Sequence, residues 1–214
     1  MNDLIVFAVL AFTSFFTLIN PLGTMPIFMT MTKDLDPKHR EHTARKASLI
    51  AFFTILFFAF TGQLLFNFFG ISVDSFRIVG GVIFFLMGMD MLQARLGKVK
   101  VQDSEIKTYV NDISVTPLAI PMICGPGAIT NAIVLMEDAE SPEKKFVLIL
   151  VIFVVLLLTY LILFSASKLI KVLGDTGNKV MMRLMGLIVM VIAVEFFFSG
   201  LKPILINIIQ EAIK

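Results

Sequence analysis

Two stretches of this sequence place polar residues, glycine and proline inside runs that are otherwise apolar. The first is Asn20-Pro21-Leu22-Gly23-Thr24-Met25-Pro26, and the second is Pro121-Met122-Ile123-Cys124-Gly125-Pro126-Gly127. Proline removes a backbone donor and clashes with the carbonyl four residues before it, so we predict a helix that breaks near Ile19 and resumes near Met25. Backbone groups freed in hydrocarbon are costly unless protein or water satisfies them. Each break is therefore a candidate binding site.

The chemistry of the two breaks suits a small zwitterion. At the first break the amide of Asn20 is able both to donate and to accept hydrogen bonds. At the second break a helix that restarts after Pro126 directs unpaired N–H groups at the break, where they suit a carboxylate. The predicted substrate-binding residues are Asn20, Pro21, Gly23, Thr24 and Pro26 at the first break, and Gly125, Pro126, Gly127, Thr130 and Asn131 at the second.

Helix packing is the alternative explanation for several of these residues. Thr13, Thr17, Asn20 and Thr24 recur at steps of four, three and four, which puts them on one face of a helix. This face either lines a substrate path or packs against a neighbouring helix, with the threonines bonded to their own backbone. We favour packing for the threonines and binding for Asn20. The glycines of the second break also suit a tight helix crossing.

Asp90 and Glu195 are the acidic residues nearest to the interior of apolar runs. Burial favours the neutral form of a carboxyl group, so we predict both as ion-coupling residues, with Glu195 the more deeply placed. The alternatives are an interfacial position for Asp90 and an ion pair for Glu195. We predict no catalytic residue, metal site or cofactor, because His39 and His42 lie in a charged loop and Cys124 is the only cysteine.

The composition places the chain in a membrane. Of its 214 residues 57% are hydrophobic and 16% are charged, 22 are Phe, and the mean hydropathy is +0.92, which lies outside the range of soluble domains. Nucleic-acid binding has no support here. Apolar runs of about 18 residues or more are long enough to cross a bilayer. We predict six spans, at Leu4 to Met31, Ala47 to Phe69, Asp74 to Leu92, Val115 to Met136, Phe146 to Phe164 and Val180 to Leu201.

Basic residues gather in three loops on one side of the predicted bilayer. Because cytoplasmic loops carry an excess of lysine and arginine, we expect these loops in the cytoplasm and both termini outside. The loop residues are Lys33, Lys38, Arg40, Arg45 and Lys46, then Arg95, Lys98, Lys100 and Lys107, and finally Lys168, Lys171, Lys179 and Arg183. The charged arm before the second span has a predicted helix start at Asp36-Pro37.

The two halves of the chain are related by an offset of 105 residues, which lays Pro21 on Pro126 and Asp90 on Glu195. Each half contains three spans, an odd number, so the second half must be inserted upside down relative to the first. We therefore predict an all-α integral membrane protein with six transmembrane helices as two inverted three-helix repeats, in which Pro and Gly break the first and fourth helices. The single membrane domain, 1–214, divides into repeat one (1–95), a cytoplasmic linker (96–114) and repeat two (115–205).

Three motifs in order carry a family resemblance. They are Asn20 to Pro26, Arg77-Ile78-Val79-Gly80-Gly81, and Ile120 to Ile129. With these motifs the chain resembles the MarC family of integral membrane proteins, which includes the SnatA-type transporters of small neutral amino acids, and the resemblance covers nearly the whole chain. It implies a six-span, multi-pass protein of the bacterial or archaeal inner membrane. It also implies that glycine, alanine, serine or threonine is carried or exported with a proton or another ion, although other members have no settled substrate.

The predicted function is secondary transport and not enzyme catalysis. A small neutral amino acid would bind near the membrane midplane between the breaks, and rocking of the repeats would expose it to each side in turn. No nucleotide-binding motif is present, so a gradient of protons or another ion must drive uphill flux. The expected partners are this amino acid, the coupling ion and membrane lipid, with a homo-oligomer left open. The alternatives are an exporter or channel for another small metabolite, an intramembrane enzyme, or a nontransporting scaffold.

Overall fold

The computed structural model describes residues 2–93, 110 and 112–212, and the described residues form helices with no strand among them. In chain order the elements are α1 (Asn2–Ile19), α2 (Pro21–Met31), α3 (Pro37–Phe69), α4 (Val73–Leu92), η2 (Ser114–Ile123), α6 (Pro126–Asp138) and α7 (Pro142–Ala212). Most of the predicted linker, 96–114, lies outside the described residues.

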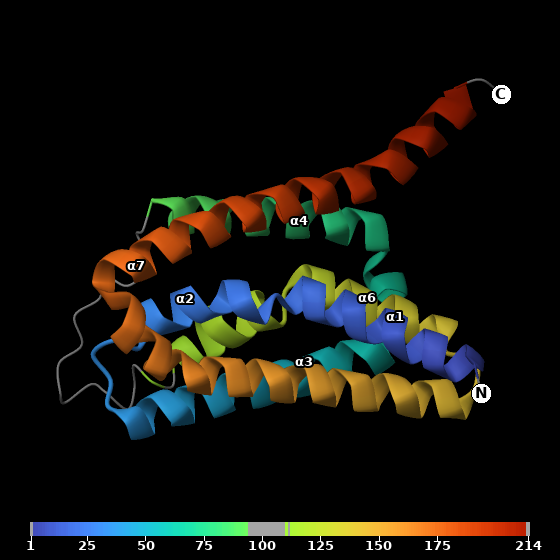
Figure 1. The fold of residues 1–214 in the computed structure, drawn as a ribbon. Coiled ribbons are helices and arrows are strands. Elements are labelled where there is room, and N and C mark those ends of the chain that lie inside the picture. Colours follow the sequence, from blue (N-terminus) through green and yellow to red (C-terminus); the bar gives the residue numbers. More distant parts are fainter. Residues whose placement is uncertain (1, 94–109, 111, 213–214) are drawn as a thin grey trace.

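The membrane spans agree closely with the sequence-based expectation. Five helical segments are long and apolar enough to cross a bilayer, and η2 with α6, which are bent by 57° at their junction, form a sixth when counted as one span. The element α7 contains two of these spans, which we call its first arm (Pro142–Ala166) and its second arm (Lys179–Ala212). Figure 1 shows the chain turning back between the two arms. The chain is thus a multi-pass, all-helical membrane protein.

The second span begins well before the expected Ala47, because the charged arm before it is already part of α3. Asp36 caps this helix: its Oδ1 accepts a hydrogen bond from the backbone N–H of His39 at 2.8 Å, and Pro37 occupies the first helical position. The hydrogen bond from the His39 backbone, followed by that from its ring, lowers the pKa of Asp36. The helix start predicted at Asp36-Pro37 is therefore confirmed.

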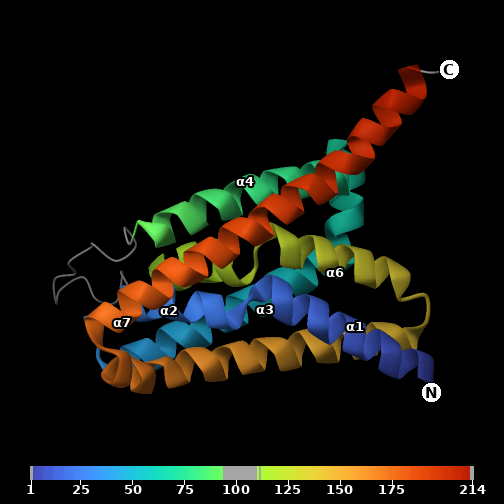
Figure 2. The same cartoon turned by 45° about the horizontal axis from the view of Figure 1, so that its top comes forward.

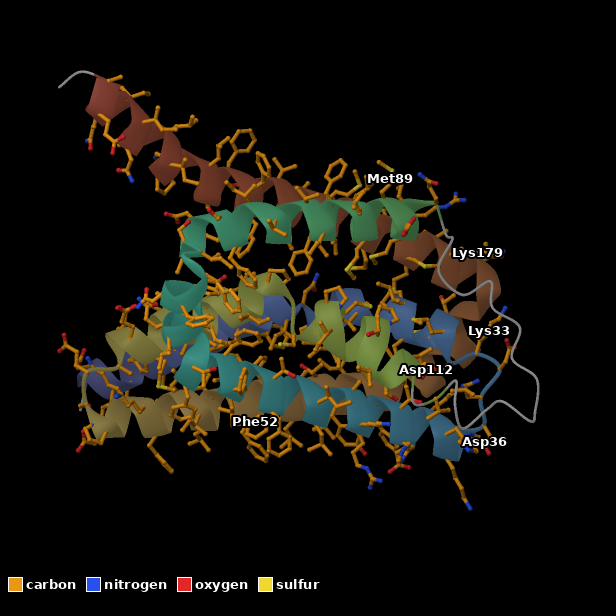
Figure 3. All side chains as sticks on the ribbon, turned by 180° about the vertical axis from the view of Figure 1, so that it is seen from behind. Lys33, Asp36, Phe52, Met89, Asp112 and Lys179 are labelled. Atoms are coloured by element: carbon orange, nitrogen blue, oxygen red, sulfur yellow. The ribbon has the colours of Figure 1, made fainter. Side chains whose placement is uncertain are left out.

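The broken helices lie between two pairs of straight helices. Figures 1 and 3 show α4 beside the second arm of α7 on one side, α3 beside the first arm on the other, and α1, α2, η2 and α6 between the pairs. Both termini lie at one end of the bundle, opposite the α2–α3 connection and the turn of α7. Figure 2 shows the end of α7 projecting beyond α4 at the end that holds the termini.

Small residues bring α4 and the second arm of α7 into backbone contact along a line that we call the glycine seam. A Cβ atom added to Gly81 would lie 2.8 Å from the carbonyl oxygen of Ala193. One added to Gly88 would lie 2.9 Å from the carbonyl oxygen of Gly186. Both distances are shorter than any real Cβ contact, so the two helices approach this closely only because glycine has no side chain.

Replacing Gly186 with alanine is expected to lower the free energy of unfolding by about 1–3 kcal/mol, the usual cost of overpacking. The new Cβ would meet the Gly88 carbonyl oxygen at 2.8 Å and the Leu92 nitrogen at 2.9 Å, and backbone atoms cannot move aside. Thermal unfolding in detergent, followed by circular dichroism, measures the effect. The neighbouring Leu187→Ala, at a residue 48% exposed, serves as control. Equal melting temperatures for both variants would contradict a tight seam.

Candidate functional site

The first break is a single residue, Asn20, in the left-handed backbone conformation. Its φ of 46° and ψ of 63° separate α1, which ends at Ile19, from α2, which begins at Pro21. Asparagine enters this region more readily than other residues with a Cβ. Its side chain also caps α2, because Oδ1 accepts a hydrogen bond from the Gly23 backbone N–H at 3.1 Å. Asn20 therefore both turns the chain and closes the exposed end of α2.

The helix restarts at Pro21 and not near the expected Met25. Proline at the first helical position lacks only a donor that would be unpaired there in any case, so it starts a helix as readily as it ends one. Pro26 then lies inside α2. The freed carbonyl groups find a local partner in the buried Thr24, whose hydroxyl donates to Asn20 O at 3.2 Å and lies 3.4 Å from Ile19 O.

The second break is longer and less regular. In η2, Thr116 and Ile120 have extended backbone angles, and both precede a proline across a cis peptide bond. The helix α6 then starts at Pro126 with Gly125 as its cap, a residue that has no side chain to bond the first turn. The first amide groups of such a helix have no acceptor within it. The first turn of α6 therefore faces the second break with the partial positive charge of a helix start, and whether it binds an anion stays a prediction.

A small cavity of about 40 Å³ lies beside the first break. Its walls come from both halves of the chain and are apolar, apart from the polar groups of the break itself. The lining residues are Leu18, Ile19, Asn20, Gly23, Thr24 and Ile27 of α1 and α2, Phe84, Met87 and Met91 of α4, Met122 of η2, and Val189 and Ile192 of the second arm.

Phe84 connects this cavity with the second break. Its side chain lines the cavity and is only 7% exposed. A Cβ atom added to Gly125 would lie 2.6 Å from Cε1 of the same ring, so the ring rests directly on the backbone of the second break. Phe84 therefore fills the space between the two breaks, and Gly125 is glycine because the ring requires that space.

The cavity brings together only some of the predicted substrate-binding residues. Asn20, Gly23 and Thr24 line it. Pro21 and Pro26 are buried in α2 and are absent from its lining. The side chain of Asn20 also covers Gly23, where an added Cβ would lie 2.8 Å from Asn20 Cγ. The polar centre of the first break is thus compact and depends on glycine at position 23.

The predicted residues of the second break are packed against other helices. Pro126 meets the backbone of Gly80 in α4, and Gly127 lies against Leu18 and Phe196. Farther along α6, Asn131 Nδ2 donates to Ser14 Oγ of α1 at 3.0 Å. The hydroxyl of Thr130 is buried and has no partner among the described residues. These contacts hold α6 against α1, α4 and α7.

The polar face expected on the first span divides at the break. Asn20 and Thr24 face the cavity, whereas Thr13 and Thr17 are exposed on the outside of the bundle. The Thr13 hydroxyl donates to the carbonyl of Val9 at 2.9 Å, which is the backbone bonding expected for a threonine without a binding role.

The two predicted ion-coupling residues lie outside the cavity. Asp90 of α4 and Glu195 of the second arm are both exposed, and neither belongs to the cavity lining. Each shares a helix with cavity residues, however, since Asp90 precedes Met91 and Glu195 follows Ile192 by less than one turn.

Sequence reasoning missed the apolar part of the lining, namely the methionines of α4 and η2, Phe84, and the residues of the second arm. One available signal would have found four of them. The offset of 105 residues carries Phe84 to Val189 and Met87 to Ile192, and all four of these residues line the cavity.

Comparison with known proteins places the chain in a family. The family model described as MarC family integral membrane protein matches residues 5–205. The chain belongs to the MarC family. The resemblance noted from the three sequence motifs is thus confirmed.

Curated MarC relatives match along almost their full length. A UPF0056 membrane protein of Pyrococcus horikoshii is 41% identical over 191 residues, which cover 89% of this chain and 92% of the relative. Another, of Methanocaldococcus jannaschii, is 37% identical, and the match covers 92% of this chain and 97% of the relative. A third, of Aquifex aeolicus, is 32% identical, and the match covers 96% of this chain and 97% of the relative. No solved structure matches the chain.

Proposed function

We propose that this MarC protein is a secondary transporter of a small neutral amino acid such as glycine, alanine, serine or threonine. The observation that carries the proposal is the cavity between the two helix breaks, which both halves of the chain line. Interrupted helices that meet at such a junction are the usual substrate site of transporters built from repeats.

The polar groups at the breaks suit the ends of an amino acid. Oδ1 of Asn20 is occupied by Gly23, but Nδ2 has no partner among the described residues and is free to donate to a carboxylate. The start of α6 adds a partial positive charge behind Phe84. The carbonyl oxygen of Asn20 is used by Thr24, accepting from its backbone N–H at 3.0 Å and from its hydroxyl at 3.2 Å, whereas that of Ile19 lies 3.4 Å from the same hydroxyl and is the better placed of the two to meet an ammonium group.

The proposal includes the inverted repeat, which the glycine seam supports. Moving Gly81 by 105 positions gives Gly186, and moving Gly88 by the same amount gives Ala193. The contact of Gly81 with Ala193 therefore becomes the contact of Gly88 with Gly186 when the halves are exchanged. A pseudo-twofold axis through the α4–α7 pair would produce this exchange, and it would also place equivalent residues on the two sides of the cavity.

The small volume of the cavity supports alternating access. About 40 Å³ holds roughly one or two water molecules and is too small for an amino acid. Cargo would enter only when α4 and the second arm move relative to α1 and α2. Phe84 would then leave Gly125, which opens the path between the first and second breaks.

Coupling to a proton or another ion is proposed to act through the same helix pair. Asp90 and Glu195 are exposed on α4 and the second arm and are equivalent at the offset of 105 residues. A change in the charge of either carboxylate would alter how deeply its helix sits in the membrane. Coupling would therefore not need direct contact between carboxylate and cargo.

The proposed location is the inner membrane, with both termini outside. Figure 1 shows both termini at one end of the bundle, and Figure 3 shows Lys33 and Lys179 at the opposite end. The excess of basic residues in the connecting loops supports a cytoplasmic location of that opposite end.

Uptake of labelled alanine and glycine into proteoliposomes, with and without an imposed pH gradient, tests the function. We expect saturable uptake that the gradient increases and that unlabelled alanine inside the vesicles accelerates. Acceleration by internal cargo separates a carrier from a channel, which shows no such countertransport. Uptake that stays at the level of empty liposomes under every gradient would exclude amino-acid transport.

A further inference from the structure

A groove of about 230 Å³ lies on the bundle surface near the α2–α3 connection and shares no lining residue with the cavity. Its apolar floor consists of Phe28 of α2 together with Leu163 and Phe164 of the first arm. Its charged rim comes from the first turns of α3 and contains Lys38, Arg40 and Glu41. We call this feature the α2–α3 groove.

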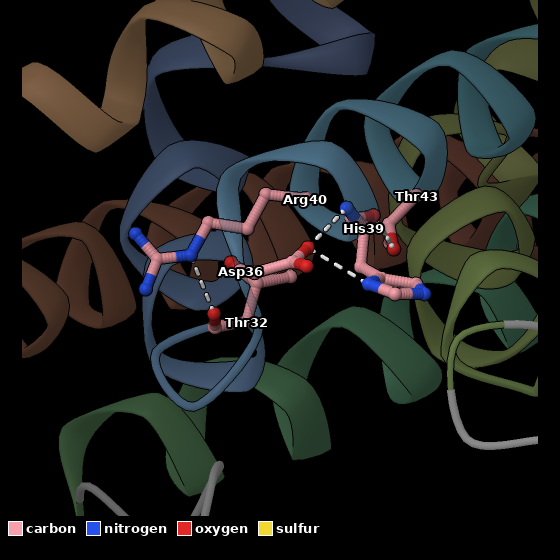
Figure 4. Close-up of polar contacts among 5 residues, drawn as sticks. All are labelled: Thr32, Asp36, His39, Arg40 and Thr43. Carbon is pink, nitrogen blue, oxygen red and sulfur yellow. Dashed lines mark hydrogen bonds and ion pairs between the residues drawn. The ribbon is translucent and has the colours of Figure 1, made fainter. Parts of the chain in front are cut away.

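The structure holds Arg40 firmly at the rim. Its Nε donates to the carbonyl oxygen of Thr32 at 2.8 Å, and Nη2 donates to that of Lys33 at 2.5 Å, as Figure 4 shows for Thr32. A guanidinium group carries five N–H donors, so these two bonds leave donors available. Arg40 is therefore a fixed cation with free donors at the mouth of the groove.

The charge of the rim is positive. Lys38 is exposed and Arg40 is fixed, against the single carboxylate of Glu41. The nearby carboxylate of Asp36 is absent from the groove lining, and its Oδ1 is turned to His39, whose backbone N–H lies at 2.8 Å and whose Nδ1 lies at 2.7 Å. A phosphate group would be attracted to the Lys38 and Arg40 side of the rim.

The apolar floor of the groove favours a phospholipid over a small soluble phosphate compound. Phe28 and Leu163 are buried at 3% and 0% exposure, whereas Phe164 is 47% exposed at the end of an apolar span. A small soluble phosphate would leave this aromatic surface uncovered. A membrane lipid would place its phosphate against the cations and the start of an acyl chain against Phe164, which is how basic pockets between membrane helices bind lipid.

We propose that the α2–α3 groove binds an anionic phospholipid of the leaflet at this end of the bundle. The lipid joins the end of α2 to the start of α3 and to the first arm. The bound lipid thereby stabilises the position of α2, the helix that follows the first break. This proposal does not depend on the identity of the transported cargo.

The test uses the purified full chain in a neutral detergent, with phosphatidylglycerol, phosphatidylcholine or glycerol phosphate added. Native mass spectrometry counts bound lipid, and circular dichroism measures the melting temperature. We expect one retained phosphatidylglycerol and a rise in melting temperature, with weaker effects of phosphatidylcholine and none of glycerol phosphate. Lys38→Gln should weaken phosphatidylglycerol binding about fivefold, the usual effect of one basic residue at a membrane surface, and Lys38→Arg should restore it.

Lys33→Gln is the matched control, because Lys33 is an exposed cation in the same loop and its side chain is absent from the groove lining. Binding by Lys33→Gln should equal that of the unchanged protein. An equal loss in Lys33→Gln and Lys38→Gln would overturn the proposal, since it would show a general attraction of the basic end. Equal retention of phosphatidylcholine and phosphatidylglycerol would overturn it as well.

Discussion

Replacing Asn20 with glycine is expected to raise the KM for alanine uptake about tenfold to a hundredfold while the protein still folds. Glycine keeps the left-handed backbone at φ 46° without strain, and loss of a helix cap to glycine costs only a few tenths of a kcal/mol. What disappears is the donor Nδ2 in the cavity. Hydrogen bonds to charged groups contribute about 1.5–3 kcal/mol, which corresponds to the stated change. Uptake kinetics in proteoliposomes measure it.

Two further variants at Asn20 separate binding from folding. Asn20→Ala loses the donor and also the local hydrogen bond by which asparagine tolerates the left-handed region, where an ordinary residue costs about 1–2 kcal/mol, so we expect a lower melting temperature together with lost uptake. Asn20→Asp keeps the cap on Gly23 but sets a carboxylate against the carboxylate of the cargo, so it should fold and fail to transport. Normal uptake by both Asn20→Gly and Asn20→Asp would exclude a role for the amide in binding.

Replacing Phe84 with leucine is expected to widen the range of cargo and to expose the second break. The ring occupies the space between the cavity and Gly125, so a smaller side chain makes room for a larger substrate. We expect uptake of leucine relative to alanine to rise about tenfold, within the 1–3 kcal/mol typical of one methylene in an apolar pocket. Competition of unlabelled amino acids against labelled alanine measures this ratio.

Cys124 provides a second measurement that needs no transport. It is the only cysteine in the chain, it precedes Gly125, and it is fully buried. Phe84→Leu should therefore increase its rate of alkylation by N-ethylmaleimide about tenfold, if opening the site costs about 1.4 kcal/mol less without the ring. Phe85→Leu changes the neighbouring residue, 37% exposed on the outer side of α4, and should alter neither measurement. An unchanged alkylation rate in Phe84→Leu would show that the ring does not close the second break.

Proline and glycine made the position of both breaks predictable, because their effects on a helix are local. The same rules misplaced the restart of α2, since proline ends one helix and begins another. The capping bond that the Gly23 N–H donates to Asn20 Oδ1 favours a start at Pro21 over one at Met25. The spans themselves followed from apolar length, which a bilayer fixes within a few residues.

The walls of the cavity were not predictable from local rules. Phe84 and the methionines of α4 are ordinary apolar residues in sequence, and their place beside Asn20 depends on how α4 packs against the broken helices. Asp90 and Glu195 show the opposite limit. Their residue type made them candidates, because acidic residues are rare in apolar runs. The face of the helix on which an isolated acidic residue lies does not follow from the sequence, however, and in the structure both residues are exposed.

The glycine seam has a consequence for the biosynthesis of the protein. In the seam Gly88, near the end of α4, meets Gly186 of the second arm, so nearly the whole second half of the chain must leave the ribosome before α4 acquires its partner. Until then, the bare backbone groove along Gly81 and Gly88 faces lipid or the insertion machinery. Assembly of the protein is thus completed only at the end of translation, and a chain truncated before the second arm would contain an α4 that packs against α6 but lacks its main partner.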